Sequence, residues 1–366
     1  MILSFINLLL LSLISLITGA GNPGDPVKAE LLFAGDAMQH QAQLDKAKEL
    51  GGGSRYDYSG CFRLIAPAVT EADYAVCNLE VPLGGGPGYS GYPCFSAPDS
   101  FAEALRDAGF DMMLTANNHT LDRRDKAARR TLHALDSLGI DHTGTFFDAA
   151  QRKQLVPFIK SVNGIKFAFL NYTYGTNGIE PREGVEVALI DKPAILAEIK
   201  KAKEAGAEMI IVCLHWGIEY TVKENEYQRK LGRYLIDNGA DMIIGSHPHV
   251  IQPMEIIKRP PEQGDALIVY SLGNFISNMK TDDTRGGAIV TVTVERGSDG
   301  KPRLKSATYD TVYAAKPHAP GTNYMVIPWW MPEEIPAAQR GWWDIFSRTA
   351  ERVFSTYNKG VPRTER

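Results

Sequence analysis

Residues 242–249 read Met242-Ile243-Ile244-Gly245-Ser246-His247-Pro248-His249, an apolar run followed at once by a glycine, a hydroxyl and two imidazoles. The apolar run is typical of a short buried strand, because turn-type residues bound it. In an open α/β sheet, ligands bind outside the carboxyl ends of the strands. This stretch therefore predicts an α/β fold whose functional side chains lie where a strand ends.

The same arrangement, an apolar strand followed by polar side chains, recurs at four other places in the chain. Strand-like runs at residues 31–34, 74–77, 112–114 and 210–214 lead into Asp36, Glu80, Asn118 with His119, and His215. Oxygen and imidazole donors of this kind suit Mn, Fe or Zn better than Ca or Mg. The pattern predicts divalent metal ions, up to two per chain, that activate water.

Each of these residues has a simpler interpretation when it is taken alone. A single histidine after a strand, such as His215, is more often a hydrogen-bonded loop residue than a ligand. An Asn-Asn pair is typical of a turn. His247 and His249, one residue apart in extended backbone, would point to the same side, and Gly245 would allow close approach or simply mark a turn. The repetition of one arrangement along the chain favours the metal site.

Six short motifs resemble those of the capsule poly-γ-glutamate synthesis protein family, CapA, a divergent branch of the calcineurin-like metallophosphoesterases. They lie in the family's order within about residues 28–310. They are Gly35-Asp36-Ala37-Met38, Asn78-Leu79-Glu80, Ala116-Asn117-Asn118-His119 with Asp122, His215-Trp216-Gly217-Ile218-Glu219, Gly245-Ser246-His247-Pro248-His249-Val250 and Ser271-Leu272-Gly273-Asn274-Phe275. The resemblance implies an α/β fold, a two-sheet sandwich flanked by helices in a four-layer αββα, metallophosphoesterase-like arrangement.

The resemblance also assigns roles to individual side chains. Asp36 and His249 would hold one metal ion, and Glu80 would bridge it to a second. The second ion would be held by Asn118, His215 and His247, with His119 as the general acid beside the leaving group. The family relationship further implies a metal-dependent hydrolase of the bacterial envelope, acting in the assembly of capsule or poly-γ-glutamate-type polymer.

Two positions depart from the wider phosphoesterase pattern, which usually has His where Met38 stands and Asp where Glu80 stands. A thioether is a poor ligand for a hard divalent ion, so the first ion is expected to be weakly held or absent. His40 would be a replacement ligand, although a surface or helix role is the simpler interpretation. These departures leave a second function open, that of a catalytically weak binding or scaffolding subunit in a membrane polymer-synthesis complex.

Asp122 and Asn274 each have two interpretations. Asp122 follows His119 by three residues, so it either accepts a hydrogen bond from the imidazole and fixes its tautomer or caps the helix that begins near Arg123. Asn274, after the strand at residues 268–270, would donate to the substrate, although an asparagine there more often satisfies a loop backbone. We take His119 and Asp122 as the catalytic candidates and Asn274 as the candidate that binds substrate.

The composition is that of a globular enzyme, because 366 residues with 44% hydrophobic and 22% charged content can bury a large core. A net charge of −4 gives no reason to expect nucleic acid as a partner. The family resemblance implies an anionic polymer or phosphoester-type substrate and membrane polymer-synthase subunits as partners.

Helical spacing at residues 98–108, 126–138, 194–205 and 226–238 alternates with apolar runs, as in a mostly parallel sheet. After about residue 261 the pattern is of strands alone. We expect a metallophosphoesterase-type domain at residues 28–310 and an aromatic-rich C-terminal extension at residues 316–366 that docks on the core.

The first 20 residues predict an exported protein of the periplasm or cell envelope. Residues 2–17 are rich in Leu and Ile and carry no charge, and Thr18-Gly19-Ala20 resembles a cleavage site. No Lys or Arg precedes the apolar stretch, so a signal peptide and an uncleaved membrane anchor are both open. Of the cysteines, Cys77 and Cys213 are expected to be buried, whereas Cys61 and Cys94 are candidates for a disulfide.

Overall fold

The computed structural model describes residues 27–86 and 88–366. The predicted signal peptide or anchor at residues 1–20 therefore lies outside the described residues. Within the described part of the chain, no helix combines the length and the apolar character needed to cross a membrane.

The first sheet joins a parallel half to an antiparallel half. Its parallel half contains β1 (Lys28–Ala37), β2 (Tyr74–Leu79), β3 (Met112–Leu114) and β4 (Asp141–Thr143). The antiparallel half contains β14 (Gly286–Arg296), β15 (Pro302–Ala315) and β16 (Met325–Pro328), and β14 pairs with the other edge of β1. The short strand β13 (Asn274–Ile276) pairs in parallel with the end of β1.

The second sheet has the strand order β11-β12-β10-β9-β7-β6. Its members are β6 (Phe158–Val162), β7 (Ile165–Thr173), β9 (Met209–His215), β10 (Met242–Ser246), β11 (Met254–Ile257) and β12 (Ala266–Val269). The four central strands are parallel, and β6 and β11 run antiparallel at the edges. A separate short pair joins β5 (Thr145–Phe146) to β8 (Glu186–Val187).

The two sheets pack face to face because their strands alternate apolar side chains between two cores. Leu31 and Phe33 of β1 share one buried core with Phe167 and Phe169 of β7. The intervening residue Leu32 faces a different core, on the outer side of the first sheet. This period of two residues is what a strand buried on both faces requires.

Helices cover both outer faces of the sandwich. On the first sheet lie α2 (Gln41–Leu50), α3 (Ala66–Thr70), α4 (Asp99–Asp107) and α5 (Arg124–Leu138), whose apolar residues join the core on that face. On the second sheet lie α7 (Lys192–Glu204) and α8 (Glu226–Asp237), which begin at the N-caps Asp191 and Asn225. A further helix, α6 (Ala149–Leu155), precedes β6. The predicted α/β sandwich of two sheets flanked by helices is therefore confirmed.

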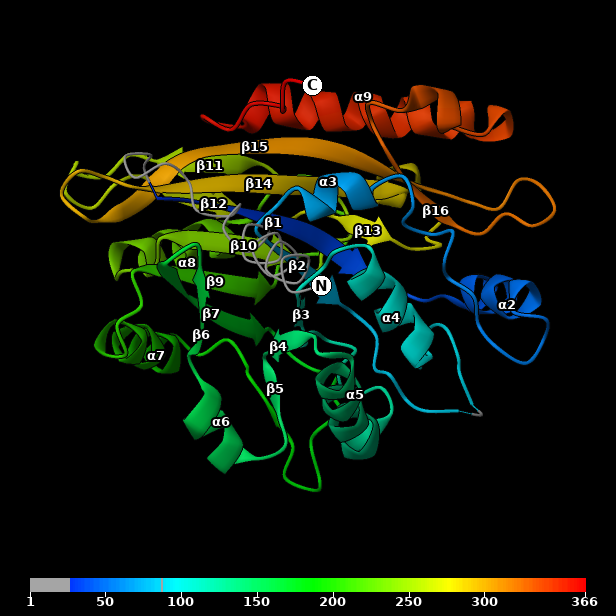
Figure 1. Cartoon of the computed structure of the whole chain (residues 1–366), viewed down its shortest axis with the longest axis horizontal. Coiled ribbons are helices and arrows are strands. Elements are labelled where there is room, and N and C mark those ends of the chain that lie inside the picture. The colour runs from blue at the N-terminus through cyan, green and yellow to red at the C-terminus, as the bar shows by residue number, and fades with distance from the viewer. Residues whose placement is uncertain (1–26, 87) are drawn as a thin grey trace, which may run out of the picture.

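The C-terminal residues belong to the same body as the sheets. Residues 325–328 form β16, and α9 (Arg340–Tyr357) lies along β15, on the opposite side of the molecule from α7 (Figure 1). Phe354 of α9 packs on Tyr309 of β15 at 4.2 Å between ring centres. Three short 3₁₀ turns, Asp282–Thr284, Pro332–Glu334 and Ala337–Gln339, complete the described elements.

The candidate disulfide between Cys61 and Cys94 is absent, because the cysteines are free thiols. Cys77 and Cys213 are buried, as expected. Burial raises the pKa of the Cys61 thiol, which keeps it protonated.

Gly35 allows β1 and the turn before β13 to approach each other closely. A Cβ atom at position 35 would lie 1.9 Å from the carbonyl oxygen of Gly273. The next residue, Asp36, donates its backbone N–H to that same oxygen at 2.9 Å. A side chain at position 35 would therefore push the end of β1 away from β13.

We expect Gly35→Ala to lower the free energy of unfolding by at least about 1–3 kcal/mol, the usual cost of overpacking. Gly60→Ala is the matched control, because a Cβ there meets nothing within 4 Å. Urea denaturation of both variants measures the difference. Equal stability of the two variants would contradict the close packing at Gly35.

Candidate metal centre

The candidate site lies where the carboxyl ends of the parallel strands of both sheets meet. From the first sheet, Asp36 lies near the end of β1, Glu80 directly follows β2, and Asn118 and His119 lie in the turn after β3. From the second sheet, His215 ends β9, and His247 and His249 follow β10. All seven side chains are buried. The structure thus brings together all the residues that the sequence predicted as metal ligands.

Two clusters that could hold a metal ion share Glu80. One contains Asp36, Glu80 and His249, and the other contains Glu80, His215 and His247. Oε1 of Glu80 lies 3.4 Å from Nε2 of His215 and 3.7 Å from Nε2 of His249. Glu80 therefore lies between the two clusters, as a bridging carboxylate must.

Asn118 adds an oxygen donor to the cluster of His215. Its Oδ1 lies 2.8 Å from Nε2 of His215. Its amide nitrogen donates to Oδ1 of Asn177 at 3.2 Å, which turns the carbonyl oxygen toward the histidine. The second cluster therefore has four candidate donors, two nitrogens and two oxygens.

The Glu80 carboxylate gives the strongest indication that a cation belongs here. Neither of its buried oxygens has a hydrogen-bond partner, and Nδ1 of His247 also lacks one. Burying a charge without a partner is costly, so such groups are normally paired or bound to metal. Burial, reinforced by the charge of Asp36, raises the pKa of Glu80 well above its usual value. A divalent cation would offset this cost, so these residues fit a metal site.

Asp36 is held as a carboxylate by its neighbours. Burial alone would raise its pKa, but a hydrogen bond from His249, the nearby imidazoles and a hydrogen bond from Asn78 lower it. The amide nitrogen of Asn78 donates to Oδ1 of Asp36 at 2.7 Å. Sequence reasoning assigned no role to Asn78, although it lies in the motif that contains Glu80, two residues before that carboxylate.

The histidines differ in charge state. Burial lowers the pKa of His215 to about 3 and that of His247 to about 2, so both are neutral imidazoles, the form that binds metal. Nδ1 of His215 lies 3.0 Å from the Ser246 hydroxyl, which orients the ring. Burial also opposes a charge on His249, but Glu80 and Asp36 outweigh it and raise the pKa to about 9.

The turn after β10 is not extended, contrary to the sequence prediction. His247 has φ of 99° and His249 has φ of 58°, both in the left-handed region. Non-glycine residues adopt this region rarely, and such strain is concentrated at functional sites. The two imidazoles reach the site through this turn rather than through the alternation of a strand. Gly245 does serve close approach, because a Cβ there would lie 2.0 Å from the carbonyl oxygen of Tyr270.

His119 and Asp122 form a hydrogen-bonded pair beside the clusters. Nδ1 of His119 lies 2.8 Å from Oδ2 of Asp122, and the same oxygen accepts the backbone N–H of Phe95 at 2.7 Å. The N-cap of α5 is Arg123, and no side chain caps that helix. The capping interpretation of Asp122 is therefore wrong, and its contact with His119 is present.

Asn274 lies beside His249. Its Oδ1 is 3.1 Å from Nδ1 of His249, and its amide nitrogen donates to the carbonyl oxygen of Thr284 at 2.9 Å. The side chain is fully buried. This geometry favours a role in holding His249 and the following loop over the predicted contact with substrate.

His40 joins none of the clusters of His, Cys, Asp and Glu found among the described residues. Met38 is buried in the apolar core on the outer face of the first sheet. His40 is the N-cap of α2, where its Nδ1 lies 3.2 Å from Oε1 of Gln43 and accepts the backbone N–H of Asn278 at 3.3 Å. Position 38 thus serves packing, and His40 serves the start of a helix.

Sequence reasoning also assigned no role to three residues at the more exposed side of the site, Tyr174, Glu219 and Tyr220. The ring of Tyr174 lies 4.5 Å from that of His247, and the ring of Tyr220 lies 6.3 Å from that of His249. The side chains of these tyrosines are about half exposed, at 49% and 55%. Glu219 forms a third cluster with His247 and His249. Only Glu219 carried a signal in the sequence, because it lies in the motif that begins at His215.

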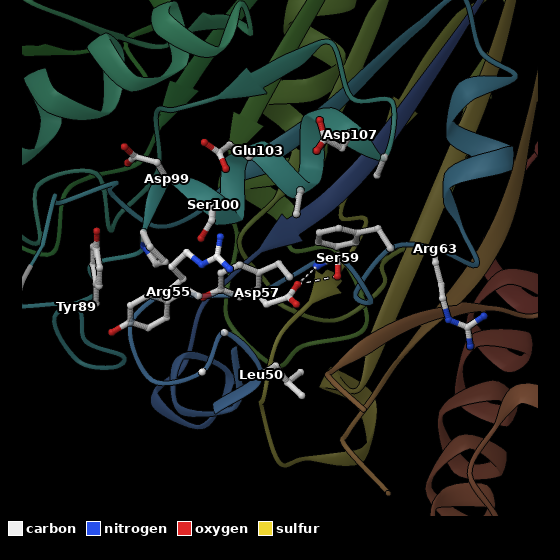
Figure 2. A pocket seen from close by; sticks show the side chains of 18 of the residues that line it. Leu50, Arg55, Asp57, Ser59, Arg63, Tyr89, Asp99, Ser100, Glu103 and Asp107 are labelled. Atoms are coloured by element: carbon white, nitrogen blue, oxygen red, sulfur yellow. Dashed lines mark hydrogen bonds between the residues drawn. The ribbon is translucent and has the colours of Figure 1, made fainter. Parts of the chain in front are cut away.

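A large cavity lies apart from these residues. It has a volume of about 890 Å³ and lies between α4 and the segment that follows α2. Figure 2 shows Asp99, Ser100, Glu103 and Asp107 of α4 on one side and Arg55 and Asp57 on the other. None of the predicted site residues lines it. The candidate metal ligands therefore lie at the ends of the strands and not in this cavity.

Comparison with known proteins identifies the family. The model of the bacterial capsule synthesis protein family PGA_cap matches residues 30–279, so the chain belongs to this family. The capsule biosynthesis protein CapA of Bacillus anthracis is 30% identical over 247 residues, which are 65% of this chain and 58% of that protein. The PGA biosynthesis protein CapA of Bacillus subtilis strain 168 is 27% identical over 273 residues, which are 74% of this chain and 68% of that protein. The predicted CapA resemblance is thus confirmed.

Among solved structures, the NAD nucleotidase NadN of Haemophilus influenzae aligns with a TM-score of 0.48 and 11% sequence identity. The alignment covers 90% of this chain and 61% of that chain.

We expect His247→Ala to lower the content of divalent metal in the purified protein, because loss of a ligand costs about ten-fold or more in affinity. Elemental analysis after loading with Mn²⁺ measures the effect. His133→Ala is the control, since His133 lies exposed on α5. Unchanged metal content in His247→Ala would contradict the assignment of this cluster as a metal site.

Proposed function

We propose that this PGA_cap family member is a metal-dependent hydrolase that acts in the assembly of capsule or poly-γ-glutamate-type polymer. The observation that carries the proposal is the buried Glu80 carboxylate, which has no hydrogen-bond partner and is shared by two clusters of ligand type. The hydrogen-bonded pair of His119 and Asp122 lies beside it. A carboxylate shared by two ligand clusters, with an imidazole nearby, suits hydrolysis at a two-metal centre.

Asp36, Glu80 and His249 would hold one ion, and Glu80, Asn118, His215 and His247 would hold the other. The mixture of imidazole, carboxylate and amide oxygen favours Mn, Fe or Zn. When bound, such ions lower the pKa of water and stabilise negative charge on a phosphoryl or carbonyl oxygen.

His119 would act as the general acid that protonates the leaving group. Asp122 accepts from Nδ1 and so leaves Nε2 as the ring nitrogen that exchanges a proton with substrate. Phe95 supports this geometry, because its ring packs edge-on against the imidazole at 4.7 Å and its backbone N–H holds Asp122. His119 is buried, which restricts its motion.

The family and the site both support the proposed substrate class. The relatives from Bacillus anthracis and Bacillus subtilis are described as proteins of capsule and PGA biosynthesis. An anionic polymer or a phosphoester would bring an oxygen ligand to the divalent ions. We place the protein in the periplasm or cell envelope, exported by its first 20 residues, where such a polymer would be handled together with membrane polymer-synthase subunits.

A second function is favoured by one observation, the burial of Met38 in the apolar core. The cluster of Asp36, Glu80 and His249 then has no ligand from position 38, and a weakly held ion would reduce turnover. On this alternative the protein binds polymer or scaffolds the synthesis complex without rapid hydrolysis.

Assay of the Mn²⁺-loaded protein against a phosphodiester and against γ-glutamyl oligomers separates the two functions. Hydrolysis of either substrate that is lost in a chelator and restored by metal supports the hydrolase. Metal binding and polymer binding without hydrolysis of either substrate would favour the scaffolding role.

We expect His119→Ala to retain its metal and its fold. Its kcat should fall about 10²–10⁴-fold, which is the usual contribution of a positioned general acid. The loss should be smallest for substrates whose leaving groups need no proton. Steady-state rates on p-nitrophenyl and alkyl phosphodiesters compare the two cases, with His133→Ala as the control. Loss of metal as complete as in His247→Ala would show instead that His119 is a ligand.

A further inference from the structure

We propose that Glu219 is a metal ligand, a carboxylate donor that acts together with His247 and His249. The proposal rests on the two-metal centre proposed above and adds a donor on the open side of that centre. It goes beyond the roles that the motifs imply, which assign no ligand to Glu219.

The first observation is distance. A carboxylate oxygen of Glu219 and one nitrogen each of His247 and His249 all lie within 4.8 Å of one another. Atoms at this spacing can bind one ion, because ligands on opposite sides of a metal with bonds of about 2.0–2.2 Å lie roughly 4 Å apart. Glu219 is partly exposed, whereas the two histidines are buried, so it approaches from the open side of the site.

The second observation is the unequal supply of donors. The ion near His215 would have four protein donors, Glu80, Asn118, His215 and His247. The ion near His249 would have three, Asp36, Glu80 and His249. Glu219 is the remaining member of the clusters found among the described residues 27–86 and 88–366. It shares its cluster with His249, a donor to the ion that has fewer ligands, and with His247, a donor to the other.

Neither Met38 nor His40 supplies a further donor to the ion near His249. Met38 packs in the apolar core, and Nδ1 of His40 is engaged at the start of α2. A carboxylate from the opposite sheet meets the same chemical need, because carboxylate oxygen is a good ligand for Mn, Fe and Zn.

The third observation is that the loop carrying Glu219 is fixed to the ligand turn after β10. Trp216 is fully buried, and its indole N–H donates to the carbonyl oxygen of Tyr270 at 3.0 Å. The backbone N–H of Trp216 donates to Ser246 at 3.1 Å, and that of Tyr220 donates to Pro248 at 2.8 Å. The segment on both sides of Glu219 is therefore anchored to the residues next to His247 and His249. A ligand needs such support to hold its geometry.

Two tyrosines flank the histidine pair on this side of the site. Tyr174 packs on His247, and Tyr220, the neighbour of Glu219 in the chain, lies near His249.

The test compares wild type, Glu219→Gln and Glu226→Gln in Mn²⁺ titrations, with calorimetry for affinity and electron paramagnetic resonance for the pairing of ions. Glu219→Gln preserves the shape of the side chain and removes its charge. Glu226→Gln is the matched control, because Glu226 is exposed at the start of α8 and pairs with Lys230 at 2.8 Å. Thermal unfolding of the metal-free proteins verifies that each variant folds.

We expect wild type and Glu226→Gln to bind two ions and to give a coupled dinuclear signal. Glu219→Gln should retain one tight ion, bind the other at least about ten-fold more weakly and give the signal of isolated Mn²⁺. Two ions bound by Glu219→Gln with wild-type affinity would overturn this inference and leave the proposed function intact, with Glu219 facing substrate instead. Absence of metal binding in wild type would overturn both.

Discussion

The buried carboxylate of Glu80 is the constraint on which the site depends. It lies between two sheets with no hydrogen-bond donor on either oxygen, although the surrounding polar groups are extensively bonded. Such a group is costly to bury as a charge, and either a proton or a bound cation offsets the loss of water. Imidazole nitrogens of His215 and His249, one in each of the two clusters that share Glu80, lie 3.4 Å and 3.7 Å from its Oε1. The other candidate ligands are thus arranged around Glu80.

The two sheets contribute different chemistry to this centre. The first sheet supplies oxygen donors, from Asp36, Glu80 and Asn118, and the second supplies the imidazoles of His215, His247 and His249. Neither sheet alone forms either cluster. The apolar core between the sheets, with Phe33 on one side and Phe169 on the other, therefore also holds the site together. Close backbone approach at Gly35 and Gly245 occurs within a residue or two of Asp36 and His247, in each case to a neighbouring segment of the same sheet.

Position 38, directly after β1, serves packing in this chain. The side chain that the wider phosphoesterase pattern uses as a donor points into the apolar core in this chain. Packing and coordination thus compete for one residue of the turn after β1. A loop from the second sheet, anchored by Trp216 and carrying Glu219, approaches the same region from the opposite side.

The sequence by itself indicated several of the elements and most of the residues that meet at the candidate site. Apolar periodicity is a local property, so the strand at 112–114 and the helix near 226–237 follow from it directly. Parallel strands end at one edge, so polar residues after the strands predicted a shared site, and Asp36, Glu80, Asn118, His215, His247 and His249 do meet there.

Only the tertiary structure decided how those residues face one another. The left-handed turn at His247 and His249, the bond of Asp122 to His119 rather than to a helix end, and the free thiols of Cys61 and Cys94 depend on contacts between distant segments. Asn78 and Glu219 gain their positions in the same way, because Asn78 donates to Asp36 of β1 and a carboxylate oxygen of Glu219 lies within 4.8 Å of nitrogens of His247 and His249. The physical reason is that strand register and sheet packing fix these distances, and a local pattern of residues carries no information about either.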